Sequence, residues 1–453
     1  MPSVLISNTL AVLTLAPGQE ILENGEILIK DGEIVGVGEK GTLSSEDAER
    51  IDAHGGIVMP GFVNSHAHLP MSFFRGICHS HPEVLYEVVY PVEKHLLPSE
   101  VYPLALLGLL ETTRCGVTCT GDHYFHEEEV AKAVQDLGVR ATLGEHISSS
   151  GGPLSSPDLL ERGIKFATEW KNRHPLITTI LSPHASDTVK PEWFEELIKV
   201  SQKENLGLHL HVAQSRREVA VIEERYQKSP VQHMSDLGVL GPKTLAAHCI
   251  HVNPKDIELL REHETKIAHC PTSQLLFEQL APLPSFLHAG ISVSLSTDGS
   301  CSNDDMDLLK EMRITALAHS AQHSTPHMFQ AMDLIKMATI EGAKALGLEK
   351  TCGSLEAGKR ADLIILNADS PRMAPLHDIP NTIVFAASTD EIDLVMVDGK
   401  TRYSKQDGWP GIKSGNVIKD AEAATISLLK RAYKADPSIR NLFETRFWKE
   451  VTK

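Results

Sequence analysis

Residues 60–70 read PGFVNSHAHLP, an apolar run that ends on the two histidines His66 and His68. Successive side chains of a strand point to opposite faces, so residues two apart point to the same side. A His-x-His pair at a strand end therefore offers two metal ligands on one face. Taken alone, the pair is equally well explained as two histidines that bind no metal.

The chain on either side of this stretch alternates between short apolar runs and amphipathic segments. Helical spacing of apolar residues is clear in residues 127–138, 191–206, 254–263 and 304–322, and strand-like runs occupy residues 178–186, 206–214, 243–252, 265–273 and 291–299. Repeated strand–helix alternation indicates a parallel sheet. About eight such units between residues 59 and 350 predict an α/β fold of the (β/α)8 TIM-barrel type.

Both ends of the chain have a β-rich texture instead. Residues 1–58 and 351–410 contain alternating apolar runs broken by turns such as Asp31-Gly32, and the run 381–390 has the same texture. Neither end is long enough to close a sheet alone. The sequence therefore predicts a small composite β-sandwich formed from both chain ends, followed by a helical tail over 411–453.

Composition limits the class of protein. The chain has 453 residues, 42% of them hydrophobic, and a formal net charge of −17, which disfavours nucleic acid and anionic lipid as partners. No apolar run reaches the roughly 18 residues of a membrane span, and the first residues lack the pattern of a signal peptide. The seven cysteines form no CxxC pair and are expected to be reduced. A cytoplasmic protein is predicted.

Three further strand-like runs carry histidine or aspartate at or near their ends. His211 lies in LHLHV, His248 in LAAHC, and Asp298 follows ISVSLST. Because a TIM barrel gathers its chemistry at the carboxyl ends of the strands, these side chains are expected to meet His66 and His68. Imidazole and carboxylate ligands suit Zn²⁺ and related divalent ions, which lower the pKa of a bound water to about 7. For His209, His251, His123 and His126, an ordinary structural role is at least as good an interpretation.

In these motifs, and in the C-terminal phrase CGSLEAGKRADLIIL, the chain resembles the amidohydrolase superfamily. Phrases such as PMSFFRG and LAAHCIHV are most similar to its methylthioadenosine/S-adenosylhomocysteine deaminases and triazine hydrolases. The resemblance extends to about residue 405. It implies a barrel with a composite sandwich, and one divalent ion held by His66, His68, His211 and Asp298. Zn²⁺ is favoured for that ion, with Fe²⁺, Mn²⁺ and Co²⁺ as alternatives.

The resemblance also implies roles around the metal. His248 contacts the metal or its water, and Asp298 acts as the base. His184, in a Pro-His motif, binds the heterocycle, and Glu83 is the nearest match to a carboxylate that binds ribose hydroxyls. Arg140 matches a family arginine whose role, substrate contact or structural support, stays open. The expected partners are a small heterocyclic substrate and further copies of the chain, in a homodimer or homotetramer.

One departure from the family concerns proton transfer. Family deaminases carry a Glu three residues after the third metal histidine, and here that position holds Gln214. An amide cannot carry a proton at neutral pH, and general acid–base help is worth about 10²–10⁴-fold. Gln214 can keep an orienting role in a deaminase, with Glu83 or Asp122 reaching in as another carboxylate. Alternatively, the enzyme has a different leaving group, as in dechlorination, where the group departs as an anion, or in the hydrolysis of an amide or amidine. A further alternative is a non-catalytic binding homologue.

Two smaller departures concern the pocket. The segment HCPTSQ places Gln274 where the family often has Asn, and Tyr86 is the ring nearest to the position of a family tryptophan. The pocket is therefore expected to differ from a standard adenosine pocket. The main prediction is a metal-dependent hydrolase that breaks a C–N bond of an amino-substituted heterocycle, such as an adenosine derivative or a triazine, by attack of a metal hydroxide on the ring carbon.

Overall fold

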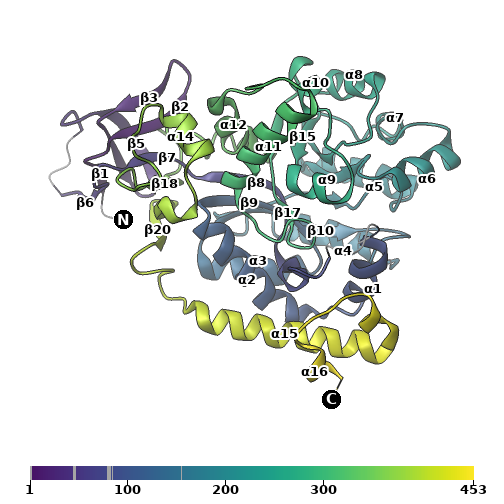
Figure 1. Ribbon diagram of the computed structural model, residues 1–453. Coiled ribbons are helices and arrows are strands. Elements are labelled where there is room, and N and C mark those ends of the chain that lie inside the picture. The colour runs from purple at the N-terminus through teal and green to yellow at the C-terminus, as the bar shows by residue number, and fades with distance from the viewer. Residues whose placement is uncertain (1–2, 44–46, 79–82, 84, 155, 453) are drawn as a thin grey trace.

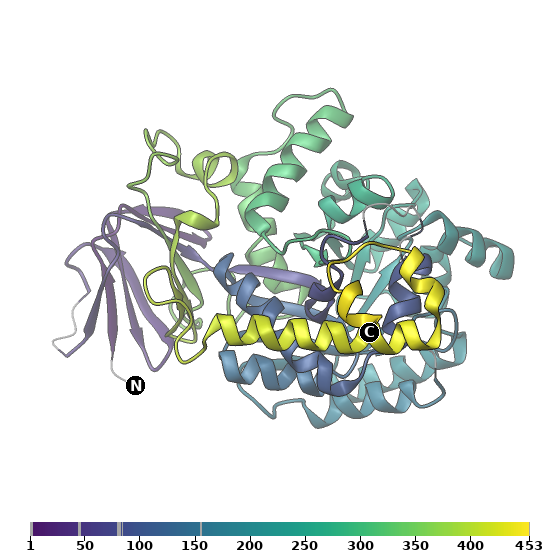
Figure 2. The same cartoon turned by 60° about the horizontal axis from the view of Figure 1, so that its bottom comes forward.

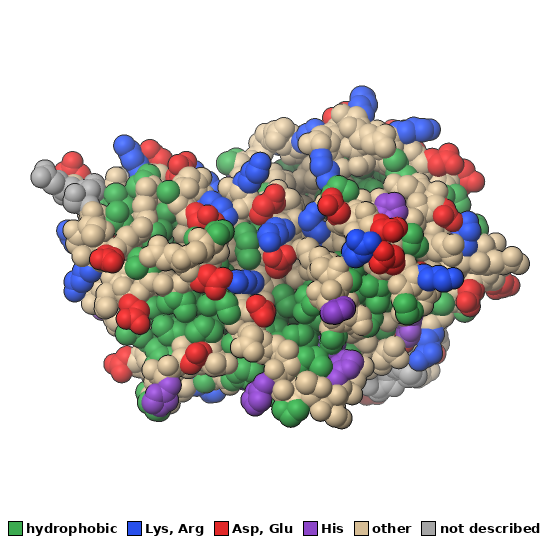
Figure 3. Space-filling view, turned by 90° about the horizontal axis from the view of Figure 1, so that it is seen from above, with side chains coloured by type: hydrophobic (Ala, Val, Ile, Leu, Met, Phe, Trp, Pro, Cys, Tyr) green, Lys and Arg blue, Asp and Glu red, His purple; other side chains and the backbone are tan. Residues whose placement is uncertain are grey.

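The computed structural model describes residues 3–43, 47–78, 83, 85–154 and 156–452. Figure 1 shows a large α/β part beside a smaller group of strands that contains the N-terminus. Among the described residues, no helix is long and apolar enough to cross a membrane. On the face shown in Figure 3, the acidic and basic side chains of the described residues are interspersed.

The centre of the α/β part is built from two sheets of parallel strands. The first runs in the order β17 (Asp298–Gly299), β8 (Phe62–His68), β9 (Val117–Tyr124), β10 (Arg140–Ile147) and β11 (Ile177–Thr179), with β12 (Ser182–Pro183) also paired to β10. The second runs in the order β13 (Leu208–Val212), β14 (Thr244–His248), β15 (Lys266–His269) and β16 (Val293–Leu295). Isolated parallel bridges join Leu181 to Leu208 and Ala185 to His211, between the two sheets.

Helices alternate with these strands along the chain, as predicted. The four expected helices are α3 (Glu127–Leu137), α5 (Pro191–Glu204), α8 (Pro254–Glu262) and α11 (Leu308–Gln322). The others in this part are α1 (Tyr90–Glu93), α2 (Pro98–Arg114), α4 (Leu159–Glu169), α6 (Arg216–Tyr226), α7 (Pro230–Asp236), α9 (Pro271–Phe277), α10 (Leu283–His288), α12 (Ala331–Met337) and α13 (Ile340–Ala345). Local capping sets several helix starts; for example, the Asn253 side chain accepts hydrogen bonds from the backbone of α8.

Two more sheets are formed by the chain ends. One contains β5 (Glu33–Glu39), β4 (Gly25–Lys30), β1 (Val4–Ser7) and β6 (Glu49–Asp52); the other contains β20 (Lys400–Ser404), β19 (Ile392–Val397), β18 (Leu363–Leu366), β7 (Ile57–Pro60), β2 (Ala11–Ala16) and β3 (Gln19–Glu23). Because β18 pairs with β7, strands from both ends share the second sheet. The predicted hairpin turn is confirmed, with φ of 52° at Asp31 and 78° at Gly32.

The prediction of a β-strand in residues 381–390 was wrong. The structure forms α14 (Ile379–Phe385) there, with the Asp378 side chain accepting a hydrogen bond from the backbone of Asn381 and Pro380 in the first turn. This capping start is a helix signal, and α14 packs against α11 and α12. The β-branched residues in the segment favour a strand locally, but tertiary packing outweighs that weak preference.

The C-terminal tail is helical, as predicted. Helix α15 (Ser414–Ala435) runs across α2 in Figure 2, and a short helix, α16 (Trp448–Val451), follows it. Arg431 of α15 donates to the backbone oxygen of His95 at 3.0 Å and pairs with Glu100 at the start of α2. The tail therefore covers α2 and the short helix α1 of the α/β part.

Candidate active site

Five polar side chains meet where β8, β13 and β14 end and β17 begins. His66 and His68 end β8, His211 and His248 lie at the ends of β13 and β14, and Asp298 opens β17. The Nε2 atoms of His66, His68 and His248 lie 3.7, 3.3 and 3.9 Å from the Asp298 carboxylate. His211 Nε2 lies 3.4 Å from His68 Nε2. All five residues were predicted from the sequence.

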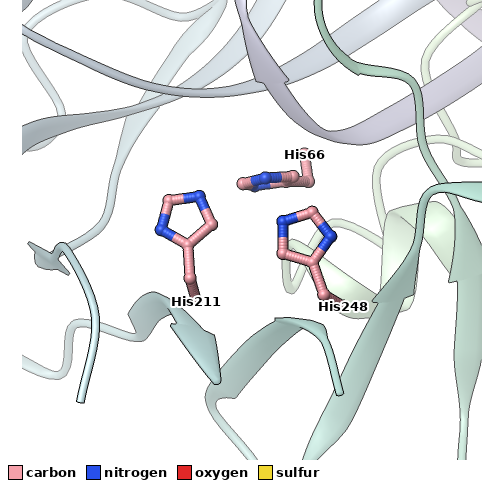
Figure 4. A group of neighbouring side chains, drawn as sticks. All are labelled: His66, His211 and His248. Atoms are coloured by element: carbon pink, nitrogen blue, oxygen red, sulfur yellow. The ribbon is translucent and has the colours of Figure 1, made fainter. Parts of the chain in front are cut away.

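The donor atoms fit one divalent ion. Donor atoms in the groups His66–His211–His248 and His66–His68–Asp298 lie within 4.8 Å of one another. The closest pairs, His68–Asp298 at 3.3 Å and His68–His211 at 3.4 Å, match the separation of about 3.3–3.4 Å between tetrahedral ligands bonded to zinc at about 2.0–2.1 Å. Figure 4 shows the three rings of the first group turned toward one another. His66 Nε2 is buried and has no hydrogen-bond partner among the described residues. A buried lone pair without a partner is what an imidazole ligand presents to a metal.

The Nδ1 atoms of three of these histidines form hydrogen bonds behind the site. His68 Nδ1 bonds the backbone oxygen of His123 at 2.6 Å, and His211 Nδ1 bonds that of His184 at 2.7 Å. Each bond places the proton on Nδ1 and frees Nε2 for a ligand. A 2.8 Å hydrogen bond joins His66 Nδ1 to His209 Nε2. His209 therefore supports a predicted ligand from behind.

Backbone geometry and charge hold Asp298 in place. Its φ is 62° and that of His248 is 73°, a left-handed conformation that is uncommon outside glycine. The Asp298 carboxylate accepts hydrogen bonds from Gly299 N, Ser273 Oγ and Ser302 Oγ at 2.7–3.0 Å. Burial alone would raise the pKa of Asp298, but the nearby imidazoles of His68, His248 and His66 hold that pKa well below its usual value. Asp298 is therefore ionised at neutral pH.

A cavity of about 330 Å³ opens onto this cluster. That volume suits a small heterocycle with a substituent. Its polar lining comprises His68, His123, His146, His184, His211, His248, Asp298, Glu83, Glu93, Glu278, Tyr86, Tyr90, Tyr124, Arg216, Arg217, Gln214, Ser215, Gln274, Ser273 and Ser302. The site therefore combines a metal-binding corner with a polar pocket.

Gln214 lines the pocket at the turn after β13. The buried Glu218 carboxylate accepts hydrogen bonds from the backbone nitrogens of Ala213 and Gln214 at 3.0 and 2.7 Å. Burial and the nearby Asp187 raise the pKa of Glu218 to about 8. This carboxyl holds the turn from behind and does not line the pocket, so the pocket face of this turn carries an amide.

The carboxylates predicted as alternative proton carriers lie in different places. Glu83 lines the pocket and is solvent-exposed. Asp122 is buried behind the pocket lining, where it accepts a hydrogen bond from Leu69 N at 2.7 Å. Glu93, a buried lining residue that accepts a hydrogen bond from the Tyr124 hydroxyl, was not predicted from the sequence. Burial raises the pKa of Glu93 to about 7.

The remaining predicted residues divide between the pocket and its surroundings. His184, Tyr86 and Gln274 lie in the lining, and Gln274 Oε1 also accepts a hydrogen bond from Ala281 N at 3.0 Å. His251 pairs with Glu278 at 3.0 Å, just outside the lining. His126, also outside the lining, contacts the Arg162 guanidinium at 3.2 Å. His123, for which a structural role seemed at least as good, lines the pocket.

Arg140 lies at the amino end of β10, outside the pocket lining. Its guanidinium donates to both carboxylate oxygens of Asp362, at 2.6 and 3.1 Å, and both side chains are buried. This geometry favours the structural alternative for Arg140, because the ion pair ties β10 to the segment that leads into β18. The structure therefore does not bring Arg140 to the substrate.

We expect Arg140→Met to destabilise the protein by about 3–5 kcal/mol, because it leaves the Asp362 carboxylate buried and unpaired. Thermal unfolding measures the loss, and the KM of the folded enzyme should not change. The double variant Arg140→Met/Asp362→Leu is the control, since removing both charges should restore most of the stability. A raised KM at unchanged stability would instead place Arg140 at the substrate.

Comparison with known proteins agrees with this geometry. Residues 57–402 match the Amidohydrolase family. The chain is 35% identical to a 5'-deoxyadenosine deaminase of Methanosarcina acetivorans, over 95% of this chain and 100% of that protein. It is 34% identical, with the same shares covered, to a 5-methylthioadenosine/S-adenosylhomocysteine deaminase of Pelotomaculum thermopropionicum.

Solved structures are similar over nearly the whole chain. An adenosine deaminase from Xanthomonas campestris with bound zinc has a TM-score of 0.89 and 27% identity, covering 94% of this chain and 98% of that one. A triazine hydrolase from Arthrobacter aurescens has a TM-score of 0.86 and 25% identity, covering 94% of this chain and 100% of that one. With its strand-end histidines and Asp298, the chain belongs to the amidohydrolase family and is a hydrolase.

Proposed function

We propose that the protein is a metal-dependent deaminase of an adenosine derivative or a similar amino-substituted heterocycle. The observation that carries the proposal is the pair of possible metal-binding groups, His66–His211–His248 and His66–His68–Asp298, which share His66 and border the pocket. The similar proteins named as deaminases of 5'-deoxyadenosine and methylthioadenosine support the substrate class. The bound zinc of the similar adenosine deaminase supports Zn²⁺ as the ion.

The ion, when bound, supplies Lewis acidity and lowers the pKa of its water to about 7. Asp298, ionised and within 4 Å of three histidine Nε2 atoms, accepts the proton of the attacking water at its carboxylate and returns it to the amino group, which leaves as ammonia. His248 faces the same point from β14 and stabilises the oxygen that adds to the ring. Gln214 and His184 orient the heterocycle by hydrogen bonds, and Glu83 binds hydroxyl groups at the pocket wall.

For the fold, we propose that residues 59–350 form a closed (β/α)8 barrel. The pairing of β17 with β8 and the bridges from Leu181 and Ala185 to β13 support closure. We also propose that residues 1–58 and 351–410 form one sandwich, and residues 411–453 a separate tail. A shared apolar cluster supports the sandwich, because it combines Ile6 and Ile27 of one end sheet with Val58 and Leu363 of the other.

We further propose a cytoplasmic homodimer or homotetramer. All seven cysteines are free and buried, which supports a reducing compartment. Gel filtration with light scattering measures the oligomeric state.

The test of the proposed function is ammonia release by the zinc-loaded protein. Adenosine, 5'-deoxyadenosine, methylthioadenosine, S-adenosylhomocysteine and a set of aminotriazines are the substrates. We expect the natural chain to deaminate at least one of them. Gln214→Glu should raise kcat by about 10²-fold, because a carboxyl can carry the proton that the amide cannot.

Gln274→Glu is the matched control, since it places the same new carboxyl elsewhere in the pocket lining and should not raise kcat. Ammonia release by Gln214→Glu alone, with none from the natural chain, would overturn the proposed deaminase.

Gln214 also favours a second candidate function, a hydrolase whose leaving group departs without a proton. A chlorinated triazine offers such a group, because chloride leaves as an anion. Chloride release from a chlorotriazine at a kcat/KM above that of every amino substrate would establish this second function in place of the first.

A further inference from the structure

Three imidazoles that take no part in the metal cluster line one wall of the pocket. His123, His146 and His184 lie at the ends of β9, β10 and β12, and all three are buried. Their ring centroids are separated by 4.6 Å (His146–His184), 5.7 Å (His123–His146) and 6.2 Å (His123–His184). Among the described residues, neither group that could hold a metal ion includes any of them. We call these residues the imidazole wall.

The hydrogen bonds of Ser148 determine the tautomer of His146. The Ser148 hydroxyl donates its proton to the backbone oxygen of Leu154, so it can only accept from His146 Nε2, at 2.9 Å. Burial lowers the pKa of His146 well below 6.5, so the ring is neutral. Its Nδ1 therefore carries a lone pair, and no hydrogen bond to Nδ1 is found among the described residues.

His184 is held in a similar way. Its Nδ1 lies 2.9 Å from Thr188 Oγ1, whose own proton is directed to the backbone oxygen of Ala185 at 3.4 Å. His184 therefore donates from Nδ1 and leaves Nε2 as an acceptor. Both nitrogens of His123 are buried without a partner in the described part of the chain. Buried polar groups are nearly always hydrogen-bonded, so His123 calls for a polar ligand, and the lone pairs of His146 and His184 call for one that supplies donors.

We propose that the imidazole wall is a hydrogen-bond-accepting subsite that selects heterocycles with an amino group in addition to the leaving group. This inference rests on the proposed function and narrows its substrate class. An exocyclic amino group brings two N–H donors to the lone pairs of His146 and His184, whereas a carbonyl or an unprotonated ring nitrogen would place a lone pair against them. The lining carboxylates Glu83 and Glu93 add further acceptors. Diaminopurine nucleosides and polyaminotriazines belong to this class.

The test compares the binding of reaction products, so that it does not depend on turnover. Calorimetry on the zinc-loaded protein compares guanosine with inosine, and ammeline with ammelide. Within each pair, the first compound carries one more amino group. We expect about tenfold tighter binding of the first compound in at least one pair. His146→Phe should abolish the difference, and His146→Gln should retain it, because its amide oxygen can still accept.

His233→Phe is the control for a buried histidine, since His233 Nε2 also lacks a partner among the described residues but lies outside the pocket lining. Metal content and melting temperature show that each variant is folded.

Equal affinity within both pairs, a difference that persists in His146→Phe, or no binding of any of the four compounds would overturn the subsite. Ammonia release without an amino preference would refute the subsite alone. An amino preference that depends on His146, without ammonia release from any substrate, would refute the proposed deaminase alone.

Discussion

Asp298→Asn is expected to lower kcat by about 10³-fold, the middle of the range for loss of a general base. The amide is nearly the same shape as the carboxylate, so it can keep the hydrogen bonds from Ser273 and Ser302. It cannot accept the proton of the attacking water. The substitution also removes the negative charge that lies within 4 Å of three histidines. Steady-state kinetics on the best substrate measures the loss.

The control for this variant is Asp305→Asn, which removes a carboxylate outside the pocket lining, where it pairs with Lys310. It should leave kcat within twofold of the natural enzyme. Metal analysis of Asp298→Asn separates loss of the base from loss of the ion. A fall in kcat below tenfold, with the ion retained, would remove Asp298 from the chemistry.

His66→Ala is expected to weaken metal binding by more than about 100-fold, since it removes a ligand that belongs to both donor groups of the site. Loss of a supporting group behind a ligand typically costs about 10–100-fold in metal affinity, so His209→Ala should show a smaller effect. Competition with a fluorescent zinc chelator measures both affinities. Activity should fall with occupancy.

His251→Ala is the control for this series, because His251 pairs with Glu278 outside the metal cluster and should not change the affinity. The expected order of loss is therefore His66, then His209, then His251. Zinc affinity in His66→Ala equal to that of the natural chain would refute the assignment of His66 as a ligand.

Much of the architecture could be predicted because it depends on local patterns. Apolar runs of strand length alternate with amphipathic segments, and the segments 127–138 and 191–206 form the helices expected of them. The strand-end histidines followed from the same pattern, since parallel strands direct their carboxyl ends to one face. Residues 381–390 failed because their β-branched side chains favour a strand, while the cap at Asp378 and packing against α11 and α12 form a helix.

The parts of the site that escaped prediction depend on long-range packing. Arg140 meets Asp362 across 222 positions of sequence, and no local pattern announces such a pair. Glu93 reaches the pocket only because the chain after β8 folds back over the strand ends, where Glu93 meets Tyr124. Of the imidazole wall, His184 was predicted, but His123 and His146 were not, because they lie on different strands and no spacing relates them.

Adding zinc to the metal-free protein while ammonia release is measured tests the proposed metal-dependent deamination most directly. We predict that activity rises linearly with added zinc, reaches a plateau at one ion per chain, and is lost again with a chelator. The Asp298→Asn protein should bind the ion and stay at least about 10²-fold less active. Turnover that is unchanged by removal of the ion, or a protein that holds far less than one divalent ion per chain after reconstitution, would refute metal-dependent chemistry at this site.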